Sequence, residues 1–165
     1  MPLQKALLAA AFAIAAFPAG AGVFSTMTGF SAPAGATERK YDVATLRPED
    51  LQSCLVDAYT IDTTDVLFEI QRPKVEAERE ELKKLRDAAR AKPSGEAAAA
   101  DTELRARAQA FNARIAMLNS QVAYAQEARD RFSRNCKGRR YYFEDLTVVR
   151  DRLPVEVREV VPRPQ

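Results

Sequence analysis

The sequence predicts an all-α protein: a long antiparallel helical hairpin, a coiled coil closed at its base by a disulfide, with a flexible N-terminal tether and an extended C-terminal tail. Apolar residues recur at three- and four-residue steps in two successive stretches, which is the spacing of a coiled-coil seam. The strongest turn signal between the stretches is Pro93-Ser94-Gly95. The two cysteines, Cys54 and Cys136, lie equally far from Gly95 along the chain, so a hairpin folded there brings them together.

The N-terminal segment has the layout of a secretory signal peptide over residues 1–21. Lys5 precedes an apolar run over residues 6–17, and small residues with a cleavage position at Ala21 follow a proline. A competing interpretation extends the apolar run to about residue 24 as a retained membrane anchor, because it then just reaches the length that spans a bilayer. Both interpretations predict an exported protein of the periplasm or cell envelope.

Residues 22–46 are expected to form a flexible linker. The part from residue 25 to residue 40 is rich in Gly, Ala, Ser and Thr and has little apolar periodicity. No strand is expected before Leu51.

The hairpin is expected over residues 47–138, with its turn near residues 93–95. Pro48 and the two acids after it are a favourable helix start. Pro73 predicts a kink or a break, and Thr63 and Thr64 are candidate caps, so the first arm is either one helix or two. The seam of the first arm consists of Leu51, Cys54, Ala58, Ile61, Phe68, Val75, Leu82 and Ala89. The seam of the second arm consists of Leu104, Ala108, Phe111, Ile115, Leu118, Val122, Ala125, Phe132 and Cys136.

Charged residues interrupt both seams. Asp65 and Arg129 each interrupt an otherwise apolar stretch, and the cysteine register places Arg129 one turn from Asp65, which predicts an ion pair across the hairpin. Arg72, Arg79 and Arg86 lie one heptad apart on the first seam. Either their stems pack while the guanidinium groups reach water, or a third helix from another copy or a partner supplies acids to them.

The two cysteines predict one intramolecular disulfide, because the chain is expected to be exported and both positions match in the hairpin. An intermolecular bridge and two free thiols are the alternatives. Closing a loop of about 80 residues contributes on the order of 4 kcal/mol in the chain-entropy model. No metal site is expected, because the chain has no histidine and only two thiols.

A dense group of cations surrounds the end of the second arm, before and after the helix stop expected at Gly138. They either offset the helix dipole or contact an anionic surface, such as lipid headgroups, an anionic polymer or an acidic protein face. Nucleic acid is not an expected partner of an exported chain. The cations are Arg129, Arg131, Arg134, Lys137, Arg139 and Arg140.

Residues 139–153 contain the densest aromatic cluster, Tyr141-Tyr142-Phe143. They are expected to cover the base of the hairpin beside the disulfide, with a partner-binding patch as the alternative. Val155 and Val157 alternate with charged residues between prolines, as in a strand. Residues 154–165 are therefore expected to be an extended tail, or else a segment that adds a strand to the sheet edge of another chain.

Catalysis is not expected. The sequence contains no Gly-rich phosphate loop, no Cys-x-x-Cys, no nucleophile elbow and no histidine, so no catalytic residue, cofactor or small-molecule substrate is predicted. The predicted function is that of a non-catalytic coiled-coil scaffold, spacer or accessory subunit of a cell-envelope assembly, which binds a protein partner or itself. A periplasmic holdase and a binding module for an anionic surface, including a membrane surface, are the alternatives.

The exported helical hairpin with basic patches and a terminal strand resembles the Skp-type chaperones in architecture. That family builds a trimeric strand body from segments on both sides of its hairpin. The resemblance implies self-association and a holdase activity.

Overall fold

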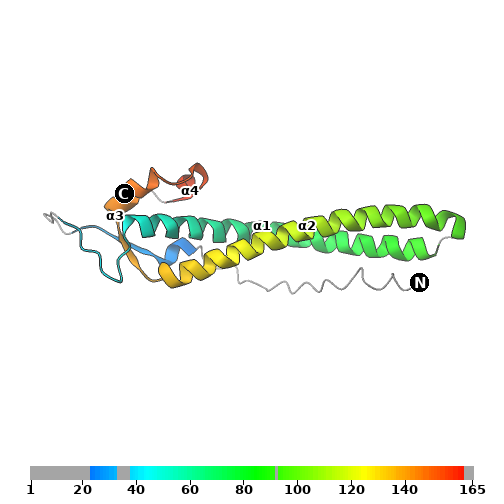
Figure 1. Ribbon diagram of the computed structural model, residues 1–165, viewed down its shortest axis with the longest axis horizontal. Helices are drawn as coiled ribbons and strands as arrows, with labels where there is room; N and C mark the ends of the chain where they lie inside the picture. The colour runs from blue at the N-terminus through cyan, green and yellow to red at the C-terminus, as the bar shows by residue number, and fades with distance from the viewer. Residues whose placement is uncertain (1–22, 33–37, 92, 162–165) are drawn as a thin grey trace.

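The computed structural model describes residues 23–32, 38–91 and 93–161, so the predicted signal peptide or anchor lies outside the described residues. The described chain is mostly helical and contains two long helices (Figure 1). The elements in chain order are η1 (Val23–Thr26), β1 (Thr28–Phe30), α1 (Pro48–Arg90), α2 (Ser94–Asn135), β2 (Arg140–Tyr142), α3 (Phe143–Arg150) and α4 (Val155–Val160).

Helix α1 begins at Pro48, after the extended backbone of Arg47, and has Glu49 and Asp50 in its first turn. Proline suits this position because the first helical N–H groups have no intrahelical acceptor, and the acids favour the positive end of the helix dipole. The helix then runs through Pro73 to Arg90, so the first arm is one helix and not two. At its 43 residues and ~1.5 Å rise per residue, α1 is roughly 65 Å long.

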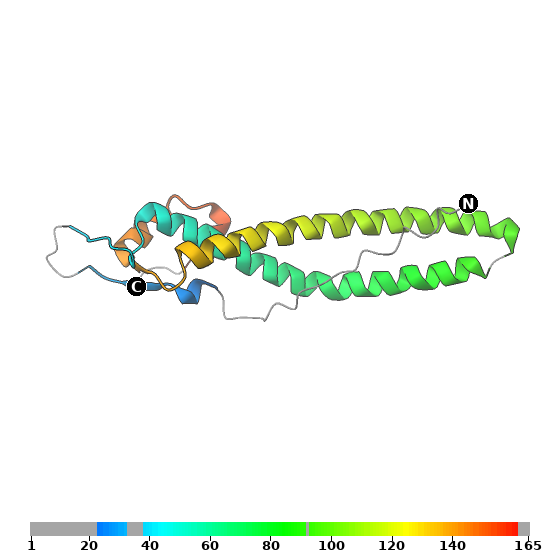
Figure 2. The same ribbon diagram turned by 60° about the horizontal axis from the view of Figure 1, so that its bottom comes forward.

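Helices α1 and α2 lie side by side, joined by residues 91–93 at one end of the molecule (Figures 1 and 2). We call that end the tip, and the opposite end, which holds the Cys54–Cys136 disulfide, the base. The prediction of a mostly helical chain with two long, packed helices and one disulfide is confirmed. Helix α2 ends at Asn135, and Gly138 follows with a φ of +74°, a backbone conformation that glycine adopts without steric cost.

The hydrophobic core lies at the base, where α3 and α4 pack on α1 (Figure 1). Its long-helix members come from the predicted seams and from their immediate neighbours Leu55 and Ala128. The largest fully buried apolar residues are Leu46, Leu51, Ile61 and Val149. A second, smaller cluster of Val75, Ile115 and Leu118 lies further along the helix pair.

A two-stranded parallel sheet joins the segment that precedes α1 in the sequence to the segment that follows α2. Strand β1 pairs with β2 so that Thr28 faces Arg140 and Phe30 faces Tyr142. Gly29 lies against the ring of Phe143, so a Cβ atom at this position would require the ring to move. The expectation of no strand before Leu51 was therefore wrong, because the partner of β1 is more than a hundred residues away and leaves no local signal in the composition.

Residues 22–46 are not a flexible linker throughout their described part. Met27, Thr45 and Leu46 are buried, and Leu46 N–H donates to the Arg140 carbonyl at 2.8 Å. The segment is held because its backbone groups, which precede α1 in the sequence, form hydrogen bonds with backbone groups of residues that follow α2.

The described part of the C-terminal tail contains a helix, α4 (Val155–Val160), where the sequence predicted an extended tail. Helix α4 follows Pro154. Val157 within α4 is buried, as are Leu153 just before the helix and Val161 just after it. The alternation of valine and charge was misleading, because the same residues also satisfy helical spacing once a core is available to bury them.

Candidate functional site

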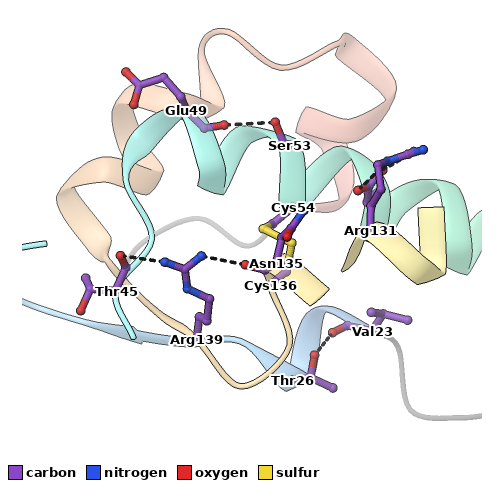
Figure 3. Close-up of a disulfide and its surroundings, with 11 residues drawn as sticks. Val23, Thr26, Thr45, Glu49, Ser53, Cys54, Arg131, Asn135, Cys136 and Arg139 are labelled. Carbon is purple, nitrogen blue, oxygen red and sulfur yellow. Dashed lines mark hydrogen bonds and ion pairs between the residues drawn. A yellow bond between two sulfur atoms is a disulfide. The ribbon is translucent and has the colours of Figure 1, made fainter. Parts of the chain in front are cut away.

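The disulfide fixes the base of the helix pair (Figure 3). Cys54 lies on α1 and Cys136 directly follows α2, with their Cα atoms 5.7 Å apart. Each cysteine is only 1% exposed. The bridge is therefore enclosed in the core, as expected for a structural disulfide.

A cleft of about 820 Å³ opens beside the disulfide. Its walls come from the first turns of α1 and from the end of α2 with the residues that follow it. Figure 3 shows Ser53 donating to the Glu49 carbonyl at 3.2 Å, and Arg139 donating to the carbonyls of Asn135 and Thr45. The lining contains the carboxylates of Glu49, Asp50 and Asp57 and the guanidinium groups of Arg131 and Arg139, so the cleft carries charges of both signs.

An ion pair between Asp57 and Arg131 crosses the helix pair in this cleft. The Arg131 Nε and Nη2 atoms both donate to the carboxylate, at 3.2 Å and 2.7 Å from Oδ1. Asp57 is buried, and its hydrogen bonds raise the pKa of Arg131. The sequence analysis missed this pair, although its members lie three and five residues from the two cysteines and so could have been found from the disulfide register.

The structure brings the predicted pair Asp65 and Arg129 together. Arg129 Nη2 donates to Asp65 Oδ1, and the side chains are 20% and 42% exposed respectively. A second carboxylate, Asp62, accepts a hydrogen bond from the Val23 N–H at 3.0 Å. Burial raises the pKa of Asp62, and the nearby charge of Asp65 raises it further. This small acidic group therefore ties η1 to α1 beside the Asp65–Arg129 pair.

The six cations predicted as an anionic-surface patch do not form one shared face of unpaired charges. Arg129 and Arg131 bind aspartates of α1, Arg139 binds backbone carbonyls, and Arg140 lies over the Phe30 ring and 3.6 Å from Asp42. Within the described ranges, Arg134 and Lys137 are the members of this set whose exposed side chains have no bonding partner.

A group of polar contacts that was not predicted from the sequence holds residues 39–41 against α3 and the end of β2. Asp145 is 2% exposed and accepts hydrogen bonds from Arg39 and from the Tyr41 hydroxyl. The Tyr142 hydroxyl donates to the Lys40 carbonyl at 3.0 Å. Burial raises the pKa of Tyr41, and the hydrogen bond to Asp145 adds to the effect.

A groove with no charged residue in its lining lies between α1 and α2, between the base and the second cluster. We call it the hydroxyl groove, and its volume is about 440 Å³. Thr63, considered above as a helix cap, instead donates to the Tyr59 carbonyl of its own continuous helix. The lining consists of Tyr59, Thr60, Thr63, Thr64, Leu67, Ser120, Gln121 and Tyr124.

The part of the helix pair nearest the tip has no buried hydrophobic residue. We call residues 76–91 and 96–114 the distal shaft. Leu82, Leu85 and Leu104 are partly buried there, and none is fully buried. Arg114 binds Glu78 across the pair at 2.7 Å. The distal shaft of the described chain is therefore joined by this ion pair and by a thin apolar stripe.

The three arginines on the first seam differ in their contacts. Arg72 reaches Glu69 and Arg86 reaches Asp87, both on α1 itself. Arg79 is exposed, and no partner for its side chain occurs in the part of the chain that the structure describes.

The described residues contain no group of three or more His, Cys, Asp or Glu side chains that could hold a metal ion. Among the same residues, no helix combines the length and the apolar composition needed to cross a membrane.

A scan against protein-family models, a search of curated proteins and a search of solved structures each found no match for this chain. The function therefore has to be inferred from the residues described above.

Proposed function

We propose that the chain is a non-catalytic, exported scaffold or accessory subunit of a cell-envelope assembly, in which an antiparallel coiled-coil hairpin presents its distal shaft to a partner. Export is supported by the signal-like N-terminal sequence and by the disulfide. The observation that carries the proposal is the contrast between a base closed by a core and a disulfide and a distal shaft without one buried hydrophobic residue.

The distal shaft can bind a partner because each helix of a two-helix pair buries only one stripe of its side chains against the other helix. Leu82, Leu85 and Ala89 recur at three- and four-residue steps and so share one side of α1, and each remains half-buried. A third helix laid against them would remove the remaining apolar area from water, at about 25 cal/mol per Å². An acid on that helix could also meet Arg79, which the described residues leave without a carboxylate.

The test is recovery of the intact protein from its native envelope, with Leu85→Glu as the variant. We expect the wild type in a stable, stoichiometric complex that Leu85→Glu weakens, because a charge would be buried in the interface. The matched control Ala77→Glu places the same charge on an exposed position of α1 that does not share the side of Leu82, Leu85 and Ala89, and it should leave the complex intact. Recovery of the wild type alone, or an intact N-terminus on protein confined to the cytoplasm, would contradict the proposal.

A holdase of the Skp type is the second candidate, and the β1–β2 sheet supports it. Both strands flank the helix pair in the sequence, as the strand segments of that family do. Within the described residues no further strand pairs with the outer edge of β1, which leaves that edge available for another copy. A trimeric mass in solution, with suppressed aggregation of an unfolded outer-membrane protein, would favour this candidate over a scaffold.

A further inference from the structure

We propose that the hydroxyl groove binds an uncharged, polyhydroxylated ligand, a segment of a neutral oligosaccharide. This site is separate from the distal shaft and does not depend on the scaffold proposal. It rests on the charge, the hydrogen-bonding capacity and the aromatic content of the lining.

The lining carries no charge, although charged residues make up 29% of the chain. An ionic ligand entering the groove would lose hydration without meeting an opposite charge, which is unfavourable. A neutral ligand avoids this cost. The lining therefore selects against the anionic surfaces considered for the arginine-rich segment.

Three hydroxyls of the lining already use their hydrogens within the protein. The hydroxyls of Thr60, Thr63 and Ser120 donate to carbonyls of their own helices, at 2.9, 2.7 and 2.7 Å. Each hydroxyl has a single hydrogen, so these oxygens can only accept from a ligand. Gln121 Oε1 is buried and has no hydrogen-bond partner among the described atoms. The groove thus offers three hydroxyl oxygens that can accept from a ligand, and one buried amide oxygen that has no donor.

Sugar hydroxyls meet this requirement better than a protein helix does. The backbone N–H groups of a helix are already hydrogen-bonded within the helix, so a helix offers few free donors. A sugar ring carries several hydroxyls that can both donate and accept. The hydroxyls of Thr64, Tyr59 and Tyr124 also line the groove and can donate to sugar oxygens in return.

Two tyrosines provide apolar surface for the carbon–hydrogen faces of a sugar. Tyr124 is 56% exposed, and Tyr59 is half-buried with its body against the core cluster. An aromatic ring with a polar tip suits a ligand that has one apolar face and a polar rim. The volume of about 440 Å³ lies within the usual range of about 300 to 1,000 Å³ for small-ligand sites.

The test is a titration of the full disulfide-bonded chain with two neutral tetrasaccharides, one of N-acetylglucosamine and one of glucose, followed by amide NMR shifts. We expect saturable shifts around residues 60–67 and 120–124 with at least one sugar, and little change when the salt concentration is raised about tenfold, because no ion pair forms. Tyr124→Ala should weaken binding about tenfold through the lost ring contact. Met117→Ala, an equally exposed position of α2 outside the lining, should not.

Gln121→Leu separates a binding role from a structural one. It replaces the buried, unpartnered oxygen by apolar groups of similar size, so the unfolding temperature should stay level or rise while sugar affinity falls about tenfold. Absence of saturable shifts with both sugars would overturn the proposal. So would a salt-sensitive response, or equal losses in Tyr124→Ala and Met117→Ala.

Discussion

Acidic residues of α1 and arginines of α2 meet at intervals along the helix pair. Asp57 binds Arg131, Asp65 binds Arg129 and Glu78 binds Arg114. Sliding one helix by a turn would separate all three pairs and leave charges against the wrong neighbours. The pairs therefore contribute to the choice of register, whether or not each adds net stability.

The Asp65–Arg129 pair gives a test of this role. Asp65→Ala removes the carboxylate facing a largely buried guanidinium, so we expect it to lower the free energy of unfolding by about 1 kcal/mol more than the double change Asp65→Leu with Arg129→Leu. Denaturant unfolding of the wild type, both single variants and the double variant measures the difference. Small and equal losses would mean that water screens the pair completely.

Asp62 gives a prediction about pH. Its pKa is raised in the folded protein, so the folded state binds the proton more tightly than the unfolded chain, and the Asp62 contribution to stability falls as pH rises from the ordinary aspartate pKa through the raised one. Asp62→Asn removes this titration. Relative to the wild type, it should therefore be more stable near neutral pH than in acid.

Thermal unfolding of both proteins at a series of pH values would measure this difference. The effect should be small, because Asp62 is only partly buried and keeps the Val23 hydrogen bond. A difference between the variants that is independent of pH would contradict the assignment.

Among the secondary-structure elements, α1 is unusual because it contains Pro73 at an exposed interior position. Proline cannot donate to the Glu69 carbonyl, and its ring crowds the preceding turn. We expect Pro73→Ala to raise the free energy of unfolding by about 1 to 3 kcal/mol. Pro48→Ala is the matched control at the first helical position, where proline is favoured, and it should give no gain. Equal effects would mean that the proline acts through the unfolded chain alone.

The long elements were predictable from the sequence and the short ones were not. Seam spacing and a central turn define α1 and α2 locally, and the symmetry of Cys54 and Cys136 about Gly95 fixes which ends meet. Strand β1 and helix α4 are short, and each owes its conformation to contacts far away in sequence. Local composition does not reveal such distant contacts. The residues of β1 were therefore predicted to belong to a linker, and those of α4 to an extended tail.

Some of the candidate sites could be predicted from the sequence and others could not. Asp65 and Arg129 could be identified because each is a polar interruption of a seam. The hydroxyl groove could not, because its threonines, serine and tyrosines are unremarkable on either helix alone. Only the packing of α1 against α2 places them in one lining.

For the molecule as a whole, the position of the disulfide determines how mechanical tension would pass through the chain. A pull between residues 23 and 161 enters α1, crosses from Cys54 to Cys136 and leaves through α3 and α4, so residues 55–135 bear no load. The distal shaft would keep its structure while tension is applied to the ends of the chain. In single-molecule stretching, reduction of the bridge should release the 82-residue separation as roughly 300 Å of additional contour length. A partner held at the tip would therefore not be pulled away when the two ends of the chain are drawn apart.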